Sequence, residues 1–164
     1  MATALAKGLV ASGLAQPEQT IASDPIDTAR NAFEKAVGGR AVDDNLAVLQ
    51  AADVLFLAVK PHLVASVLAE IRPEFRPRHL LISIAAGVSL ASLESGLSAG
   101  SRVVRVMPNT PALVGASASG FALGAAATQH DATLVHTLLS SVGTVIQLDE
   151  RLLDAVTGLS GSGP

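Results

Sequence analysis

Short apolar segments alternate along this chain with segments whose apolar residues recur every three or four positions. The short segments are rich in β-branched and aliphatic residues, which is typical of buried strands in a parallel sheet. They cover residues 20–23, 54–59, 80–84, 103–106 and 143–146, and 115–124 is a further candidate strand made mostly of small residues. Helical spacing occurs in residues 2–10, 63–71 and 134–139, and Gly143 follows the last of these as a helix terminator.

Alternating strands and helices predict right-handed strand–helix–strand units and an open, mainly parallel sheet with helices on both faces. The expected fold class is therefore α/β, with a doubly wound sheet. The 164 residues have the length of one domain. A hydrophobic fraction of 49% and a charged fraction of 15% exclude intrinsic disorder.

The two ends of the sequence do not fit a complete sheet of this kind. Met1 begins inside an apolar helical face, although a parallel strand at 20–23 needs a neighbouring strand. In a doubly wound sheet the strand that is lacking would be the central one. Residues 158–164 stop in the middle of a turn-like sequence. Two interpretations remain: an internal piece of a longer chain, or a complete domain that starts with a helix.

Composition narrows the function classes. The formal net charge is −3 and aromatic residues make up 2%, so neither a basic patch nor a stacking surface for nucleic acid is expected. The chain has no cysteine and four scattered histidines, so we expect no metal site. Its longest apolar stretches are shorter than the roughly 20 residues of a membrane helix. We therefore expect a soluble cytoplasmic domain that binds neither nucleic acid nor membrane.

Polar residues follow the first predicted strand, and the carboxyl ends of parallel strands face the ligand crevice in open α/β sheets. Asp24 stands where a carboxylate accepts the ribose 2′-hydroxyl of NAD, and Arg30 is the candidate partner of a 2′-phosphate. Alternatively, Asp24 and Pro25 cap the next helix, with the carboxylate accepting backbone N–H bonds. The residue types leave both roles open, and one carboxylate can fill both.

The next two strands also end in turns suited to a ligand. Val59, Lys60 and Pro61 follow a buried strand. Lys60 is either a cation near a phosphate or an ordinary exposed charge before a helix-opening proline. The following strand ends in small residues that allow a close approach of the backbone to a ligand: Ala85, Ala86 and Gly87.

A rigid turn and an acidic segment complete the candidate residues. Asn109 and Thr110 lie between two prolines, which hold both polar side chains in a fixed turn. Acidic residues at 149, 150 and 154 predict the charged N-terminus of a helix. The sequence contains neither the dinucleotide fingerprint G-x-G-x-x-G nor the G-x-S-x-G elbow of serine hydrolases.

Taken together, residues 53–62, 83–88, 105–111 and 154–164 resemble the pyrroline-5-carboxylate reductase family, and residues 1–9 resemble the helix that follows its Gly-rich loop. The resemblance covers essentially the whole chain in the right order. It implies a Rossmann-like domain whose first strand and Gly-rich loop are missing from this chain. The implied reaction is hydride transfer from NADPH or NADH to the C=N bond of 1-pyrroline-5-carboxylate, giving L-proline in the last step of proline biosynthesis.

The resemblance also implies which residues bind each ligand. Glu150 matches an acidic residue near the substrate pocket, and no catalytic residue is assigned within this chain. The matching cofactor-binding positions are Met1 beside the pyrophosphate, Ser23 and Asp24 at the adenosine ribose, Asn45, the turn of Val59, Lys60 and Pro61, then Ala85, Ala86 and Gly87 near the nicotinamide, and Asn109 and Thr110 in the rigid turn.

Two domains follow from the same resemblance: an NAD(P)-binding domain over 1–149 and the start of a helical dimerisation domain over 150–164. Because the rest of the helical domain carries most imine-binding residues and the dimer interface, we expect a full-length homo-oligomer and a 164-residue chain that is inactive alone. The Asp24 carboxylate opposes a 2′-phosphate, so the choice between NADPH and NADH stays open.

Two other functions are alternatives to a pyrroline-5-carboxylate reductase. One is a related NAD(P)- or deazaflavin-dependent oxidoreductase that shares the sheet but reduces another compound. The other is a non-catalytic Rossmann-type binding module that shows no stabilisation by dinucleotides.

Overall fold

The structure is a computed structural model that describes residues 1–156 and 158. The helices are Ala2–Ala11 (α1), Asp27–Val37 (α2), Asn45–Ala51 (α3), Val64–Ile71 (α4), Leu90–Ser95 (α5), Gln129–Ser140 (α6) and Glu150–Val156 (α7), with 3₁₀ helices at Pro17–Gln19 (η1), Pro61–Leu63 (η2) and Thr110–Val114 (η3). The strands are Ile21–Ser23 (β1), Arg40–Val42 (β2), Val54–Leu57 (β3), Leu80–Ser83 (β4), Arg102–Met107 (β5), Ser117–Leu123 (β6) and Gly143–Gln147 (β7). In this described part, none of the helices is long and apolar enough to cross a membrane.

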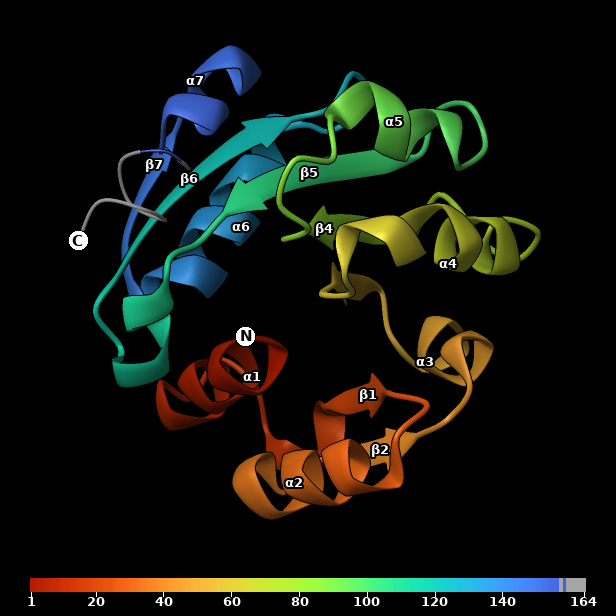
Figure 1. Cartoon of the computed structure of the whole chain (residues 1–164), viewed down its shortest axis with the longest axis vertical. Coiled ribbons are helices and arrows are strands. Elements are labelled where there is room, and N and C mark those ends of the chain that lie inside the picture. Colours follow the sequence, from red (N-terminus) through yellow and green to blue (C-terminus); the bar gives the residue numbers. More distant parts are fainter. Residues whose placement is uncertain (157, 159–164) are drawn as a thin grey trace.

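The strands form two sheets (Figure 1). A small sheet pairs β1 with β2 in parallel, and a larger sheet has the order β3-β4-β5-β6-β7. Strands β3, β4 and β5 are parallel, β6 is antiparallel to β5, and β7 is parallel to β6. The α/β class and the mainly parallel sheet predicted from the sequence are therefore confirmed.

For residues 143–146 the predicted parallel strand forms, since β7 pairs in parallel with β6, but its predicted burial is wrong. Strand β7 lies at the edge of the larger sheet, where Ile146 is 56% exposed. It also runs, with β6, against the direction of β3, β4 and β5. The cause is the short connection of residues 108–116 between β5 and β6, because a parallel crossover needs a dozen or more residues.

Three elements were not foreseen from the sequence, namely β2, α3 and α5. They contain three, seven and six residues, respectively. Such short segments do not fill the window in which a helical or alternating pattern becomes recognisable. The weak candidate strand at 115–124 does form, as β6.

A hydrophobic core covers each face of the larger sheet. Successive residues of a strand point to opposite faces, so Leu81 lies in one core and Leu80 and Ile82 lie in the other. The first core receives side chains from α3, α4, α5 and α7, namely Leu49, Leu68, Leu93 and Leu153. The second core receives them from α1 and α6, namely Leu5, Val135 and Leu139. Figure 1 shows α6 behind the sheet and α4 and α5 in front of it.

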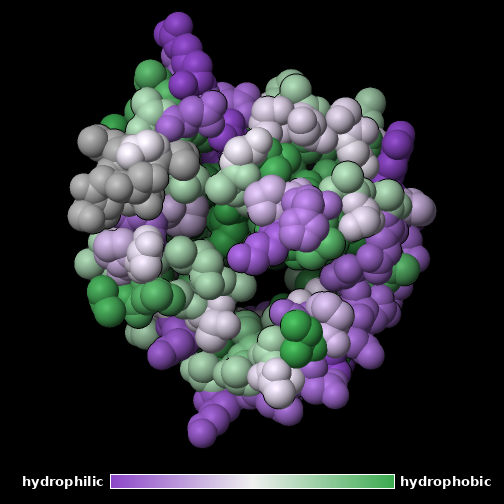
Figure 2. Space-filling model, viewed as in Figure 1, coloured by the Kyte–Doolittle hydropathy of each residue, from purple (hydrophilic) through white to green (hydrophobic). Residues whose placement is uncertain are grey.

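The two sheets are not joined by hydrogen-bonded strands. Within the described residues, β1 pairs only with β2, and β3 pairs only with β4, so each has one edge without a strand neighbour. Figure 2 shows a hollow on the displayed face between the part built from α1, α2, β1 and β2 and the rest of the molecule. The smaller sheet is therefore held to the larger one by helices and side chains.

Helix α6 begins at a capping box that includes a buried ion pair. The Thr128 hydroxyl accepts from the Asp131 N–H at 3.3 Å, while the Asp131 carboxylate accepts from the Thr128 N–H at 2.8 Å. Arg102 of β5 donates to the same carboxylate at 2.7 Å. Burial works to raise the pKa of Asp131, but the bonds from Thr128 and the charge of Arg102 outweigh it, so this pKa is lowered.

A buried histidine connects α4 to β4. His79 is 1% exposed, and its Nδ1 accepts from the Arg76 N–H at 2.9 Å. Burial lowers the pKa of His79 below its ordinary value of 6.5; Arg78 lowers it further, and Asp53 partly opposes the shift. The folded protein therefore favours the neutral imidazole more strongly than the unfolded chain does.

We expect the free energy of unfolding to fall as the pH drops from 6.5 towards the lowered pKa of His79. In that window the unfolded chain binds a proton that the folded protein resists, so acidification favours unfolding. Urea unfolding across this range measures the effect. His79→Gln should flatten the decline, whereas the exposed His136→Gln should keep it. An equal slope in wild type and His79→Gln would contradict the expectation.

Candidate functional site

The loops that carry the predicted site residues follow β1, β3, β4 and β5. Because β3, β4 and β5 are parallel neighbours, their carboxyl ends meet at one edge of the larger sheet. Residues 59–61, 85–87 and 109–110 therefore gather at that edge. Ser23 and Asp24 end β1 in the smaller sheet, and a chain of hydrogen bonds through α3 links Ser23 to α4.

Asn45 stands at the centre of this chain of hydrogen bonds. The Ser23 hydroxyl donates to Asn45 Oδ1 at 2.6 Å, and Asn45 Nδ2 donates to Glu70 Oε2 at 2.8 Å. Asn45 is the first residue of α3, which begins here because Asp44 caps it by accepting from the Leu46 N–H at 2.8 Å. The cap thus holds Asn45 at the end of β1.

Asp24 has one carboxylate oxygen committed to the backbone. Its Oδ1 accepts from the Ile26 N–H at 2.9 Å, in the turn that precedes α2. The proposed helix cap is therefore a local turn before α2, whose N-cap residue is Ile26 itself. Arg30 donates to the Asp24 carbonyl at 2.6 Å and pairs with Asp27, so both of its terminal nitrogens are engaged.

Lys60 and Pro61 form the turn after β3. Lys60 is exposed and is the N-cap of η2, and its carbonyl accepts from the Leu63 N–H at 2.9 Å. Among the described residues its ammonium makes no ion pair within 4 Å, which leaves the charge available at this edge. Pro61 occupies the first position of η2, where its missing N–H costs nothing.

Residues 85–87 form a tight turn after β4. Ala85 is buried, whereas Ala86 and Gly87 are exposed. Gly87 has a φ of 72°, a conformation that residues with a Cβ rarely adopt, and no atom lies within 4 Å of the position of such a Cβ. The glycine is thus required by the backbone conformation and leaves open space beside the turn.

The rigid turn after β5 is tied to β6. Asn109 Oδ1 accepts from the Ala118 N–H at 2.9 Å and from the Ser117 hydroxyl at 3.1 Å. Ser117 and Ser119 hydroxyls lie 2.9 Å apart and are both buried. Asn109 therefore uses its oxygen to fix the turn, while the exposed Thr110 opens η3.

Glu150 lies in a cluster of charges at the start of α7. Arg105 of β5 donates to Glu150 Oε1 at 3.0 Å and to Asp154 Oδ1 at 2.7 Å, and the Leu90 N–H donates to Glu150 Oε1 at 2.7 Å. Burial acts to lower the pKa of Arg105, but the bonds to Asp154 and Glu150 outweigh burial and raise it. Glu150 thus joins β5, α5 and α7, in addition to any contact with a substrate.

Met1 lies at the start of α1, a helix that packs against η3 in the turn after β5. It is 43% exposed and precedes α1 as its N-cap, where its carbonyl accepts from the Leu5 N–H at 3.1 Å. Residues 157 and 159–164, which include most of the turn-like segment 158–164 and of the matching motif 154–164, lie outside the described residues.

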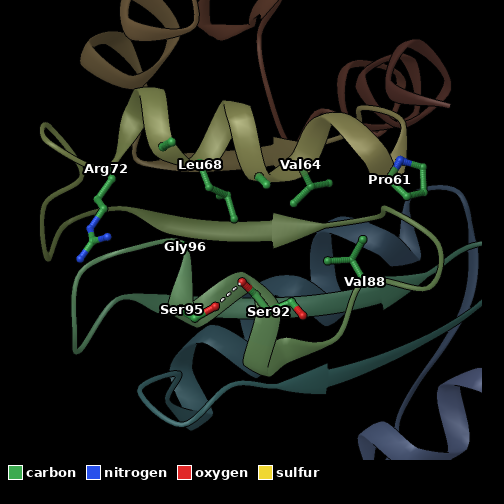
Figure 3. A pocket seen from close by; sticks show the side chains of 10 residues that line it. Pro61, Val64, Leu68, Arg72, Val88, Ser92, Ser95 and Gly96 are labelled. Carbon is green, nitrogen blue, oxygen red and sulfur yellow. Dashed lines mark hydrogen bonds between the residues drawn. The ribbon is translucent and has the colours of Figure 1, made fainter.

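A groove of about 500 Å³ lies between α4 and α5 (Figure 3). Pro61 and Val88, from the turns after β3 and β4, line one end, and Arg72 lies at the other end. Leu68 and Gly96 come together between them, with the groove otherwise lined by Val64 and by small or hydroxyl side chains. The groove therefore reaches the strand-end edge at Pro61 and Val88.

Two residues of the site were missed in the sequence analysis. Arg105 is a charged residue inside the apolar strand 103–106, and this pattern was a usable signal because an arginine is buried only with partners. Glu70 carried no such signal, since an acidic residue on the outer side of a helix is common. Its role depends on Asn45, which lies 25 positions earlier in the sequence.

Comparison with known proteins identifies the class to which this fold and site belong. The chain belongs to the family described as "NADP oxidoreductase coenzyme F420-dependent", whose model matches residues 1–87. Within this class, the chain is 44% identical to pyrroline-5-carboxylate reductase of Methanosarcina acetivorans over 164 residues. The aligned region covers all of this chain and 61% of that protein. The resemblance to pyrroline-5-carboxylate reductases inferred from the motifs is confirmed.

Solved structures agree with this similarity. A pyrroline-5-carboxylate reductase from Coxiella burnetii superposes with a TM-score of 0.93 at 32% identity, covering 99% of this chain and 61% of that one. Pyrroline carboxylate reductase of Plasmodium falciparum, solved with NADP bound, superposes with a TM-score of 0.88 at 29% identity. This superposition covers 99% of this chain and 59% of that one. The chain thus spans about three-fifths of the length of these relatives.

Proposed function

We propose that this chain is the NAD(P)H-binding part of a pyrroline-5-carboxylate reductase. The observation that carries the proposal is the similarity of the whole chain to reductases of this name. The overall reaction adds a hydride to the C=N carbon and a proton to the nitrogen of 1-pyrroline-5-carboxylate, which gives L-proline. The nicotinamide, when bound, supplies the hydride, while the protein positions the two reactants.

The residues present fit a dinucleotide. Ser23 donates its hydroxyl hydrogen to Asn45, so its oxygen lone pairs remain for a ribose hydroxyl. The second Asp24 oxygen and the second N–H of Asn45 Nδ2 are further ribose partners. Lys60 supplies a cation for a phosphate, and the space beside Gly87 suits a flat ring.

The preferred cofactor is part of the proposal. A relative with NADP bound and the NADP named in the family description support NADPH. Asp24 supports NADH, because its carboxylate favours a ribose hydroxyl over a 2′-phosphate. The contacts of Arg30 with the Asp24 carbonyl and with Asp27 use two of its five N–H donors, so three remain for a 2′-phosphate. We therefore propose use of both cofactors, with the ratio set by the balance between the Arg30 cation and the Asp24 carboxylate.

The unpaired edges of β1 and β3 support a Rossmann-like, doubly wound sheet in which one further strand lies between them. We propose that this strand and a Gly-rich loop hold the pyrophosphate beside Met1. We also propose a domain boundary at 149/150, a helical domain that completes the substrate pocket near Glu150, and a cytoplasmic homo-oligomer assembled through that domain.

The test uses the full-length product of the gene and follows the absorbance of NADH or NADPH with pyrroline-5-carboxylate. We expect oxidation that depends on the imine, and no turnover by the 164-residue chain alone. No oxidation of either cofactor by the folded full-length protein would overturn the proposal. Turnover by the isolated chain would contradict the assignment of the substrate pocket to a further domain.

A second candidate is a deazaflavin-dependent oxidoreductase, because the description of the matched family names coenzyme F420. The same protein incubated with reduced F420 and NADP distinguishes the two. Hydride exchange between these cofactors without any imine would favour the second candidate. A folded protein that shows no turnover and no stabilisation by either dinucleotide would favour a non-catalytic module.

A further inference from the structure

Glu70 of α4 makes a hydrogen bond to a different helix, α3. It lies on the exposed side of the helix, yet its carboxylate accepts from Asn45 Nδ2 at 2.8 Å. Asn45 Oδ1 in turn accepts from the Ser23 hydroxyl at 2.6 Å. Three elements distant in sequence, β1, α3 and α4, are thus connected in one line of hydrogen bonds that ends at Ser23.

The chemistry of these groups fixes which of them donates and which accepts in each hydrogen bond. A carboxylate only accepts, so it selects the amide orientation of Asn45 in which the nitrogen faces Glu70 and the oxygen faces Ser23. With the amide oxygen facing it, the Ser23 hydroxyl has to donate, which turns its lone pairs away from Asn45. Without the carboxylate, the amide of Asn45 could reverse and the Ser23 hydroxyl could take either role.

We propose that Glu70 is a positioning residue that fixes the Asn45 amide and the Ser23 hydroxyl for the adenosine ribose of the cofactor. The inference rests on the proposed function, since it takes Ser23 and Asn45 as cofactor contacts. Glu70 acts through Asn45 and touches no reacting atom. Its effect therefore falls on cofactor binding, and on NADH and NADPH alike through the 3′-hydroxyl of the adenosine ribose, which both carry; only the 2′-hydroxyl is replaced by a phosphate in NADPH.

A merely structural role for Glu70 would be to tie α3 to α4. A second bond between α3 and the segment that follows α4 provides a matched comparison: Gln50 Nε2 donates to Glu74 Oε2 at 3.0 Å. This bond also joins an amide of α3 to a carboxylate, here a partly buried one in the turn after α4, but it involves none of the predicted cofactor contacts. Glu74→Ala therefore controls for the loss of one such bond.

The experiment measures dissociation constants of NADH and NADPH by nicotinamide fluorescence on the full-length protein. Loss of one charge-assisted hydrogen bond predicts that Glu70→Ala weakens both by roughly three- to tenfold. Glu70→Gln, whose amide can either accept from Asn45 or donate to it, should fall between wild type and Glu70→Ala, and Glu74→Ala should stay within about twofold of wild type. The melting temperatures of Glu70→Ala and Glu74→Ala should fall by similar amounts.

Steady-state kinetics and a double variant complete the test. Glu70→Ala should raise the cofactor KM and leave kcat nearly unchanged. In an Asn45→Ala background, Glu70→Ala should have no further effect on cofactor binding, because the Asn45 amide through which Glu70 acts is already absent. Equal binding by Glu70→Ala and Glu74→Ala overturns the inference, as does tighter binding of NADPH alone, which would indicate charge repulsion. If wild type binds neither cofactor, the proposed function fails as well.

Discussion

Gly143→Ala is expected to destabilise the protein by about 4 kcal/mol, combining backbone strain with overpacking. Gly143 has a φ of 149° and pairs with Ser117 in the register of β6 and β7. A Cβ at this position would overlap the backbone oxygen and nitrogen of Ser117 and lie 2.7 Å from its carbonyl carbon. Since backbone atoms cannot rotate away as a side chain can, the two strands would have to separate.

Equilibrium unfolding in urea measures this cost. Gly100→Ala is the matched control, because Gly100 also has a positive φ, 81°, but no atom lies within 4 Å of the position that a Cβ would take there. That variant should lose only about 1–2 kcal/mol from the conformation alone. Equal losses for the two glycines would show that β7 moves without cost, contrary to the expectation.

Arg105→Met is expected to lower the free energy of unfolding by about 3 kcal/mol. Arg105 is 5% exposed and is the partner of both Glu150 and Asp154. Methionine fills much of the same volume but leaves the partly buried Glu150 carboxylate without its cation, and an uncompensated buried charge is costly. Asp154 contributes little of this loss, because its side chain is 75% exposed and stays solvated.

The control for Arg105 is Arg151→Met, which removes an ion pair with Asp149 in which both side chains are mostly exposed. We expect a change within about 0.5 kcal/mol there, measured by the same urea unfolding. A loss for Arg105→Met as small as that of Arg151→Met would mean that solvent screens the Glu150 cluster. Arg105→Lys should retain part of the stability, since lysine keeps the charge but cannot bridge two carboxylates with a planar fork.

The positions of the site loops followed from the sequence, whereas their internal connections did not. Residues 59–61, 85–87 and 109–110 each follow a recognisable apolar strand, so their common edge could be predicted. Ser23 and Asn45 lie 22 positions apart, and Arg105 and Glu150 lie 45 apart. Nothing in the spacing of such residues indicates contact, because their meeting depends on how separate elements pack.

The sequence by itself determined the α/β class, the main strands and the similarity to a family, because strand periodicity and ordered motifs are local properties of the chain. Only the tertiary structure decided the reversed direction of β6 and β7, the edge position of β7, and the partners of Glu70 and Arg105. Strand direction depends on the length of a connection and the packing that it permits. Which side chains meet depends on the distance between elements, and folding sets that distance through the two hydrophobic cores.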